Sequence, residues 1–568
     1  MKEFLKAGEV SGDPVFKIFK KRMFSEAARG LSRADWGAGE NRTTRRSGDA
    51  VTIVGLASDF TPRACFRNSV IPEAGGATSV AICSDLVQAA CGSSTMIEMR
   101  RMWPLACLVP AAVAYAIIGL VEYARFRTGI YDLVIFDQAV RGYSRFEVPG
   151  SFVKDQWNQL GTAVSILGDH FSPILVVLAP LYWIYDGPQT LIVAQAVLFA
   201  VAAIPLWRLS RRRLGTPAAY LVATAYLLSW PIAEAAAFHF HEYAFVPLLT
   251  AVLFERLDAG RRGAVIVSAA ALLLVKEDLG FFVAGLGLAL LFRPSWRRIG
   301  AAMVVVGPLA VWVTSQIVIP AFGGSSGRYW YYSGLGAGPG EVITRLLIRP
   351  LDVLSVLTSP GVKVQTMLLL LALVLFVPLL SPYALPPAML ILERMLATDQ
   401  PGWWSTSYHY NAAVVMALFC ASIDVIDRFQ RRRGTADVSR RRLGFTWATA
   451  CAVLGLGLVA LFPLRDVFDP AWYRSGARED AAAAAVAVVP DGALVEAANQ
   501  VGPNLSARTK VVMWRPMPRR APWVVADVAS PQPIFKSVEE QRADVAELQA
   551  RGYRLVMERE GYIVLHLP

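Results

Sequence analysis

Residues 208–262 read RLSRRRLGTPAAYLVATAYLLSWPIAEAAAFHFHEYAFVPLLTAVLFERLDAGRR. Two apolar segments, 216–234 and 243–257, are joined by a short connection that carries histidines and an acid, and an arginine cluster flanks the pair on each side. Lys and Arg near the ends of membrane spans stay on the cytoplasmic side. The stretch therefore predicts two membrane-spanning helices whose histidine-bearing connection lies on the outer face.

The same alternation continues from Trp103 to about Pro463. A membrane span needs ~20 mainly apolar residues. About eleven segments are candidates: 103–121, 189–207, 216–234, 243–257, 263–276, 279–292, 299–319, 364–380, 383–396, 411–427 and 444–463. With a cytoplasmic N-terminus, the arginine-rich connections after the second, fourth, sixth and tenth spans all fall inside, and the C-terminus falls outside.

One apolar stretch is excluded from this count. Residues 172–185 (SPILVVLAPLYWIY) are short and contain two prolines. We interpret them as a helix lying at the outer membrane interface, with Tyr182, Trp183 and Tyr185 at headgroup level.

Composition supports a polytopic membrane protein. Of 568 residues, 55% are hydrophobic and 18% are charged, against about 25% charged in soluble proteins. The net charge of +12 comes from arginines in short loops beside apolar spans, so the expected partner is the lipid bilayer and no nucleic acid. The six cysteines show neither metal-ligand spacing nor a disulfide framework.

Three regions follow. Residues 1–98 are polar and lack a clear period, whereas MRRMWP at 99–104 resembles a natural start, so 1–98 is interpreted as a non-native or disordered N-terminal extension. Residues 99–465 form the helical transmembrane bundle. Residues 466–568 are expected to be a small extracytoplasmic α/β domain that ends in a hairpin around 559–561.

The polar chemistry gathers on the predicted outer connections. Ionisable groups near membrane depth are costly and usually mark function. The candidate site residues are Asp137, Asp169, His170, His239, His241, Glu242, Lys276 and His409.

Each candidate has a structural alternative. Asp137 is a base or metal ligand, or else a helix-capping acid. Asp169 is an N-cap of the interfacial helix, which would still place His170 over the cavity. His239 and His241 are two residues apart, a weak metal motif, and interface histidines fit equally.

The remaining candidates also leave two interpretations open. Lys276 lies in a KED turn that is either solvated or binds phosphate. His409 follows Trp403 and Trp404, and these aromatics, like RYWYY at 328–332, form either a membrane belt or a carbohydrate site. Walker A, HExxH and CxxC motifs are missing from the sequence, so no nucleotide or redox cofactor is expected. A divalent metal remains open.

Four stretches carry a family resemblance: YDLVIFDQAV, GDHFSPILVVLAPLYWIY, FHFHEYAFVPLL and KEDLGFFV. The chain resembles a bacterial family of predicted membrane proteins, common in actinobacteria, that is grouped with the GT-C glycosyltransferases. The resemblance covers about 100–568 and implies transfer of a sugar from a polyprenyl-phosphate-linked donor to an envelope glycan, lipid or protein.

The resemblance also implies roles for residues. Asp137 matches the first-loop acid of GT-C enzymes, which acts as base or binds metal or acceptor. Asp169 and His170 match an acidic–basic pair that contacts donor phosphate, and Lys276 matches a lysine at the same outer hairpin. GT-C enzymes often carry paired acids in the first loop, but Gln138 follows Asp137 here, which argues against a metal-dependent version.

Two other functions fit a polytopic protein. A transporter or lipid flippase predicts ionisable groups at mid-depth and inverted repeats, and neither is seen in the sequence. A non-catalytic scaffold for envelope assembly, docking through the C-terminal domain, is the other alternative.

Overall fold

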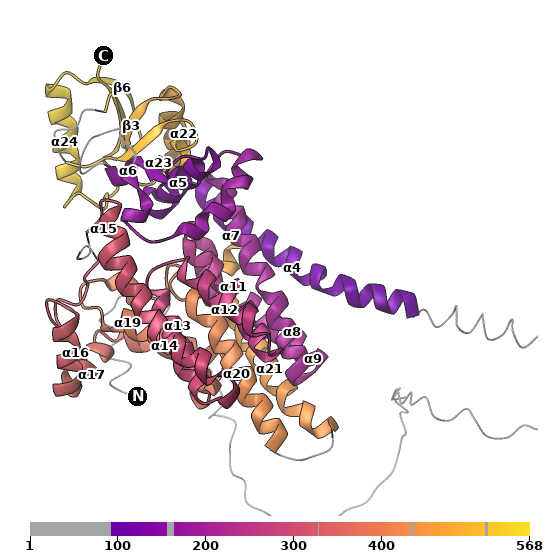
Figure 1. The fold of residues 1–568 in the computed structure, drawn as a ribbon. Coiled ribbons are helices and arrows are strands. Elements are labelled where there is room, and N and C mark those ends of the chain that lie inside the picture. The colour runs from indigo at the N-terminus through magenta and orange to yellow at the C-terminus, as the bar shows by residue number, and fades with distance from the viewer. Residues whose placement is uncertain (1–92, 156–163, 326, 328, 433–436, 517–520) are drawn as a thin grey trace, which may run out of the picture. The chain divides into compact units, whose positions relative to one another are not determined.

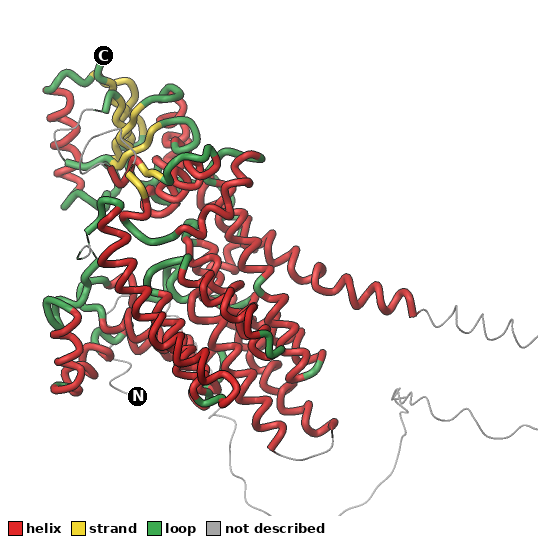
Figure 2. The backbone as a smooth tube through the Cα atoms, in the orientation of Figure 1, coloured by secondary structure: helices red, strands yellow, loops and turns green. Residues whose placement is uncertain are grey.

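The computed structural model describes residues 93–155, 164–325, 327, 329–432, 437–516 and 521–568. The chain divides into two units, Met1–Trp103 and Pro104–Pro568. The predicted N-terminal extension lies almost wholly outside the described residues. Within the second unit helices predominate, and the strands gather near the C-terminus (Figures 1 and 2).

A helix is found in every predicted apolar span. In chain order these helices are α4 (Ser93–Ala124), α7 (Gln189–Val201), α8 (Ala203–Leu214), α9 (Thr216–Leu227), α10 (Trp230–Ala237), α11 (Phe245–Asp258), α12 (Arg262–Leu273), α13 (Leu279–Leu291), α14 (Arg297–Val313), α15 (Ile319–Ala321), α18 (Val362–Leu373), α19 (Leu385–Leu396), α20 (Ala412–Arg432) and α21 (Asp437–Val459). The predicted helical bundle is therefore confirmed.

The predicted number of spans is not confirmed. Among the described residues, three helices are long and apolar enough to cross a membrane: Gln189–Leu214, Pro294–Ala321 and Arg442–Val459. A fourth joins α17 (Pro350–Thr358) to α18 across a 76° bend. Others are short: α12 has 12 residues, about 18 Å at 1.5 Å per residue, against a hydrocarbon core of ~30 Å.

The polar groups separate to opposite ends of the helices. Helix α11 begins beside Glu242 and ends at Asp258. At the C-terminal end of α11, Arg212 and Arg213 of α8 pair with Asp258. Arg213 also pairs with Asp427 of α20 at 2.5 Å. The arginine-rich connections that the sequence assigns to the inner face therefore meet at one end of the bundle.

Glycines bring α13 and α14 into direct backbone contact. A Cβ atom added at Gly280 would lie 2.4 Å from the carbonyl oxygen of Gly307, and one at Gly287 would lie 2.6 Å from that of Gly300. Real Cβ contacts are not this short, so only glycine permits this spacing. Helices α13 and α14 therefore pack with their backbones in contact at these two glycine pairs.

The interfacial stretch forms η3 (Pro173–Trp183), a 3-10 helix rather than an α-helix, because Pro173 and Pro180 each remove a backbone donor. Val176, Val177 and Trp183 are exposed, as expected for an interfacial helix. Tyr182 is buried instead of lying at headgroup level, since its hydroxyl donates to Asp137.

The first of the two predicted outer loops contains η1 (Ile130–Val134), α5 (Ile135–Ser144), α6 (Phe152–Asp155) and a two-stranded sheet of β1 (Gly150–Ser151) and β2 (Val164–Ser165). The second, expected to be Gly-rich loop, contains α16 (Pro339–Ile348) and α17. Helices thus occupy much of both loops.

The C-terminal region is the predicted α/β domain. Its five strands run in the order β4-β3-β5-β7-β6, with bounds Leu494–Ala497 (β3), Lys510–Met513 (β4), Trp523–Asp527 (β5), Arg554–Arg559 (β6) and Tyr562–His566 (β7). Strands β4, β3 and β5 are parallel, and β7 and β6 continue antiparallel. The predicted hairpin is confirmed, because Arg559 pairs with Tyr562 across the turn. Helices α22 (Ala477–Val488), α23 (Gly502–Leu505) and α24 (Val538–Ala550) complete the domain.

Candidate metal and phosphate site

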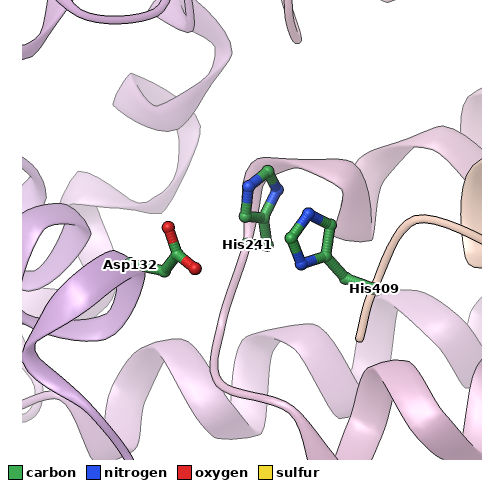
Figure 3. A group of neighbouring side chains, drawn as sticks. All are labelled: Asp132, His241 and His409. Atoms are coloured by element: carbon green, nitrogen blue, oxygen red, sulfur yellow. The ribbon is translucent and has the colours of Figure 1, made fainter. Parts of the chain in front are cut away.

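Three side chains from distant parts of the sequence meet at the end of the bundle opposite the arginines. Asp132 comes from η1, His241 from the connection between α10 and α11, and His409 from the connection before α20. One ligand atom from each lies within 4.8 Å of the others. Figure 3 shows the Asp132 carboxylate facing the two imidazoles.

The two imidazoles are neutral, and that of His409 is left without hydrogen-bond partners among the described residues. Their rings stack at 16° with centroids 3.4 Å apart, and burial lowers the pKa of both histidines well below the ordinary value. His409 is buried, and neither ring nitrogen has a hydrogen-bond partner within the described parts of the chain. Buried polar atoms are rarely left unpaired, and neutral imidazole is the metal-binding form. The arrangement indicates that a bound group completes this cluster.

The donor set suits zinc. Zn–N distances of 2.0–2.1 Å in a tetrahedral site put ligand atoms about 3.4 Å apart, so the cluster would close around an ion once the two imidazoles turn out of their stacked arrangement. Two imidazoles and one carboxylate would leave the fourth position for water or substrate. Glu242 Oε2 lies 3.1 Å from His241 Nδ1, and this nitrogen accepts the backbone N–H of Tyr243 at 3.4 Å, which leaves Nε2 of His241 as its metal-binding atom.

Lys276 and Glu242 form a buried ion pair beside the cluster. Lys276 Nζ lies 3.3 Å from Glu242 Oε1. Burial raises the pKa of Glu242 to about 7, although Lys276 opposes this shift. Burial disfavours the ammonium, but Glu242 and two neighbouring carboxylates outweigh it and raise the pKa of Lys276. A cation is thereby held next to the imidazoles.

His170 forms a second ion pair with Glu277, its Nδ1 lying 2.7 Å from Glu277 Oε1. Burial and Lys276 favour the neutral imidazole, but Glu277 and Asp169 outweigh them and raise the pKa of His170. Burial raises the pKa of Glu277, but the charge and hydrogen bond of His170, together with Lys276, outweigh it and lower that pKa to about 2. Asp169 pairs with Lys154 at 2.5 Å.

Aromatic rings cover this polar group. Tyr329 stacks on His170 at 4.5 Å between centroids and donates its hydroxyl to Asp169. Trp403 contacts both Tyr331 and Tyr410 edge-on. Tyrosines and a tryptophan from the two predicted aromatic stretches therefore lie against the site.

A family model described as predicted membrane protein (DUF2079) matches residues 122–564. The chain belongs to this family. The resemblance that the sequence showed to a family of predicted membrane proteins is thus confirmed, and the match includes every candidate site residue.

Solved structures resemble this DUF2079 member at low identity. ArnT from Cupriavidus metallidurans, bound to undecaprenyl phosphate, is 13% identical over 82% of this chain and 98% of its own, with a TM-score of 0.48. The Archaeoglobus fulgidus oligosaccharyltransferase AglB, in complex with an inhibitory peptide and a dolichol-phosphate, is 14% identical over 69% of this chain and 59% of its own, with a TM-score of 0.34. No curated protein matches the sequence.

Asp137, the predicted catalytic acid, lies in a different environment from the cluster. Its side chain is fully buried. It accepts hydrogen bonds from Tyr182 at 2.8 Å and Arg141 at 3.0 Å, and a third from the Ser506 hydroxyl. Because three donors already occupy the oxygens of this carboxylate, Asp137 resembles a structural residue of the DUF2079 fold, paired with Arg141.

Of the other predicted residues, His241, Glu242, Lys276 and His409 come together, and Asp169 and His170 lie in the adjoining pairs. His239 does not join the cluster, because its Nε2 accepts the backbone N–H of Gly129 at 3.2 Å. Sequence reasoning missed Asp132 as a ligand and Lys154 as a partner. Nothing in the linear spacing links Asp132 to His241 and His409; its place in the loop after the first span was the available signal.

Proposed function

We propose that this protein transfers a sugar from a polyprenyl-phosphate-linked donor to an envelope acceptor at the outer membrane face. The observation that carries the proposal is the buried cluster of Asp132, His241 and His409 beside the Lys276 and His170 ion pairs. Such a cluster offers a carboxylate, metal ligands and cations together. The resemblance to GT-C enzymes supplies the reaction class.

Asp132 takes the role that the sequence gave to Asp137. The acceptor hydroxyl would lose its proton to an Asp132 oxygen, form the new bond to the sugar carbon, and break the bond from that carbon to the phosphate oxygen. Negative charge then develops on the departing polyprenyl phosphate. Lys276 and protonated His170 would stabilise that charge, as preorganised cations do at a developing anion.

A divalent ion, with zinc the best match to the donor set, would be held by Asp132, His241 and His409. It would supply Lewis-acid stabilisation of the phosphate. Because a carboxylate has two oxygens, Asp132 can bind an ion with one and accept a proton with the other. Neutral histidines are the form that this role requires.

The test uses the purified full chain with a panel of radiolabelled polyprenyl-phosphate sugars and envelope acceptors. Wild type, Asp132→Asn and a matched control, Asp491→Asn at an exposed position of the C-terminal domain, are compared for release of polyprenyl phosphate. We expect turnover in wild type and control and a loss of about 10²-fold or more in Asp132→Asn, the usual size for general acid–base groups. Full activity of Asp132→Asn would contradict the assigned role.

Silence of folded wild-type protein across the whole panel would contradict the enzymatic proposal. Transport of polyprenyl-linked lipid by the same protein in vesicles would then favour the flippase interpretation. If the protein shows neither sugar transfer nor lipid transport, the non-catalytic scaffold becomes the favoured interpretation.

A further inference from the structure

A shallow cavity of about 630 Å³, wide open to the surface, lies at the arginine-rich end of the bundle, remote from the site above. It lies between the α11–α12 connection and the α13–α14 connection. Arg256, Arg261 and Arg262 line it together with Ser295 and Trp296. This volume falls within the range of small-molecule sites.

The guanidinium groups around the cavity are partly fixed in place. Arg262 donates to the carbonyl oxygen of Ser295 at 3.0 Å and lies over the Trp296 ring, 5.9 Å from its centroid. Arg256 Nε lies 2.5 Å from Glu255. An arginine that is held by one N–H group keeps the others for a ligand.

The cavity also carries uncompensated positive charge. Glu255 pairs with Arg212 at 2.6 Å as well as with Arg256, so one carboxylate serves two guanidiniums. Within the part of the chain that the structure describes, Arg261 and Arg262 show no carboxylate within 4.0 Å. A ligand with at least one negative charge would balance this group.

Apolar surface adjoins the charged cavity. Ile266 and Val267 are exposed on the next turn of α12, and Leu291 and Phe292 are exposed where α13 ends. An anionic head with an apolar tail matches both features, and basic pockets between membrane helices are known to hold lipid head groups. We propose that this cavity binds the phosphate of an anionic phospholipid on the inner face.

A soluble phosphate shares the head-group chemistry, and diffuse attraction of anionic lipid to all inner arginines is the simpler alternative. The chain offers a matched control. Arg297 and Arg298 are exposed at the start of α14, near the same connection, but do not line the cavity. Removing either pair of charges changes the net charge equally.

The test measures binding of phosphatidylglycerol, phosphatidylcholine and inorganic phosphate to the purified full chain by native mass spectrometry and thermal shift. We expect Arg261→Gln with Arg262→Gln to weaken phosphatidylglycerol binding at least about tenfold, since Arg–phosphate contacts are charge-assisted. Arg297→Gln with Arg298→Gln should change it less than about threefold. The single variant Arg261→Gln, at an exposed position, gives a second measurement if the double variant fails to fold.

Equal losses in the two double variants would overturn the proposal in favour of diffuse attraction. Equal binding of phosphatidylglycerol and phosphatidylcholine would overturn it as well. If inorganic phosphate raises the melting temperature of the protein as much as phosphatidylglycerol does, the assignment to a lipid would be overturned.

Discussion

At the residue scale, two acids of the first loop have opposite surroundings. Asp137 is enclosed by three donors, whereas Asp132 faces two imidazoles and has φ +67°. A non-glycine residue in a sparsely populated backbone region costs about 1–3 kcal/mol and persists only where the surroundings hold it. The strained acid, rather than the satisfied one, has the character of a functional residue.

The histidines give a direct test of the cluster. Zinc content of the purified protein, measured by atomic emission, should be close to one ion per chain in wild type. His409→Ala should remove it because a three-ligand site loses one ligand, while His566→Ala, in β7 and outside the cluster, should keep it. Retention of zinc by His409→Ala would contradict the metal assignment.

The buried pair of Asp137 and Arg141 is expected to contribute to the stability of the fold. Asp137→Asn removes a fully buried charge opposite Arg141, and breaking a buried pair costs about 3 kcal/mol. We expect a clearly lower melting temperature in detergent with unchanged zinc affinity. Asp186→Asn, which removes a half-exposed partner of Arg141, should change stability by about 1 kcal/mol or less. A normal melting temperature for Asp137→Asn together with lost turnover would restore Asp137 as the catalytic acid.

The pair of His170 and Glu277 predicts a pH dependence. Because folding raises the pKa of His170, its contribution to stability is fully present below the unfolded value and is lost as the pH rises through the folded value. The difference in melting temperature between wild type and Glu277→Gln should therefore be larger at pH 6 than at pH 9. Some difference remains at pH 9, because Glu277 also accepts the N–H of Phe171 at 3.0 Å. A difference that grows with pH would refute the assignment.

At the element scale, the C-terminal domain holds η1 in place. The backbone N–H of Ile130 donates to both the carbonyl and the side-chain oxygen of Asn499, at 3.0 and 2.9 Å. Gly502 approaches Ile130 so closely that a Cβ there would lie 2.2 Å from it. These contacts fix the backbone two residues before Asp132, so the domain acts as a support for the candidate ligand.

Replacement of Asn499 tests this support. Asn499→Ala should lower zinc affinity about 10–100-fold, the usual effect of outer partners of a metal site. Asn499→Asp keeps the acceptor oxygen and should restore most of the affinity. The readout is competition with a chelator on the full chain, and equal affinities of wild type and Asn499→Ala would show that η1 holds Asp132 unaided.

The sequence predicted the helices well and the site only in part. Apolar runs and arginine clusters are local signals, so the helices of the predicted spans could be placed from them, whereas α17, in a stretch expected to be a loop, could not. Asp132, His241 and His409 meet only because three connections converge, and no local pattern records that convergence. Helix α13 matches its predicted span closely, but α12 ends at Leu273, before the predicted end at residue 276, because apolar residues continue past the point where the backbone turns, as at Leu274 and Val275.

At the scale of the whole molecule, the orientation in the membrane is a prediction. In a background with the six cysteines replaced by serine, Arg551→Cys in the C-terminal domain should react with an impermeant maleimide on intact cells. Ala259→Cys, in the α11–α12 connection, should react only after permeabilisation. Both parent residues are exposed, so access of the reagent to the site itself is not limiting. The reverse labelling pattern would invert the proposed topology.

The glycine contacts between α13 and α14 restrict how a membrane-borne substrate reaches the site. Because the backbones of α13 and α14 touch at two positions along the helices, the gap between them is too narrow for an isoprenoid chain. A lipid carrier whose tail stays in the bilayer while its head group reaches His241 must therefore enter through another gap between helices. Bulky side chains placed along that gap would block turnover, whereas changes on the outer surface of α14 would leave the route open.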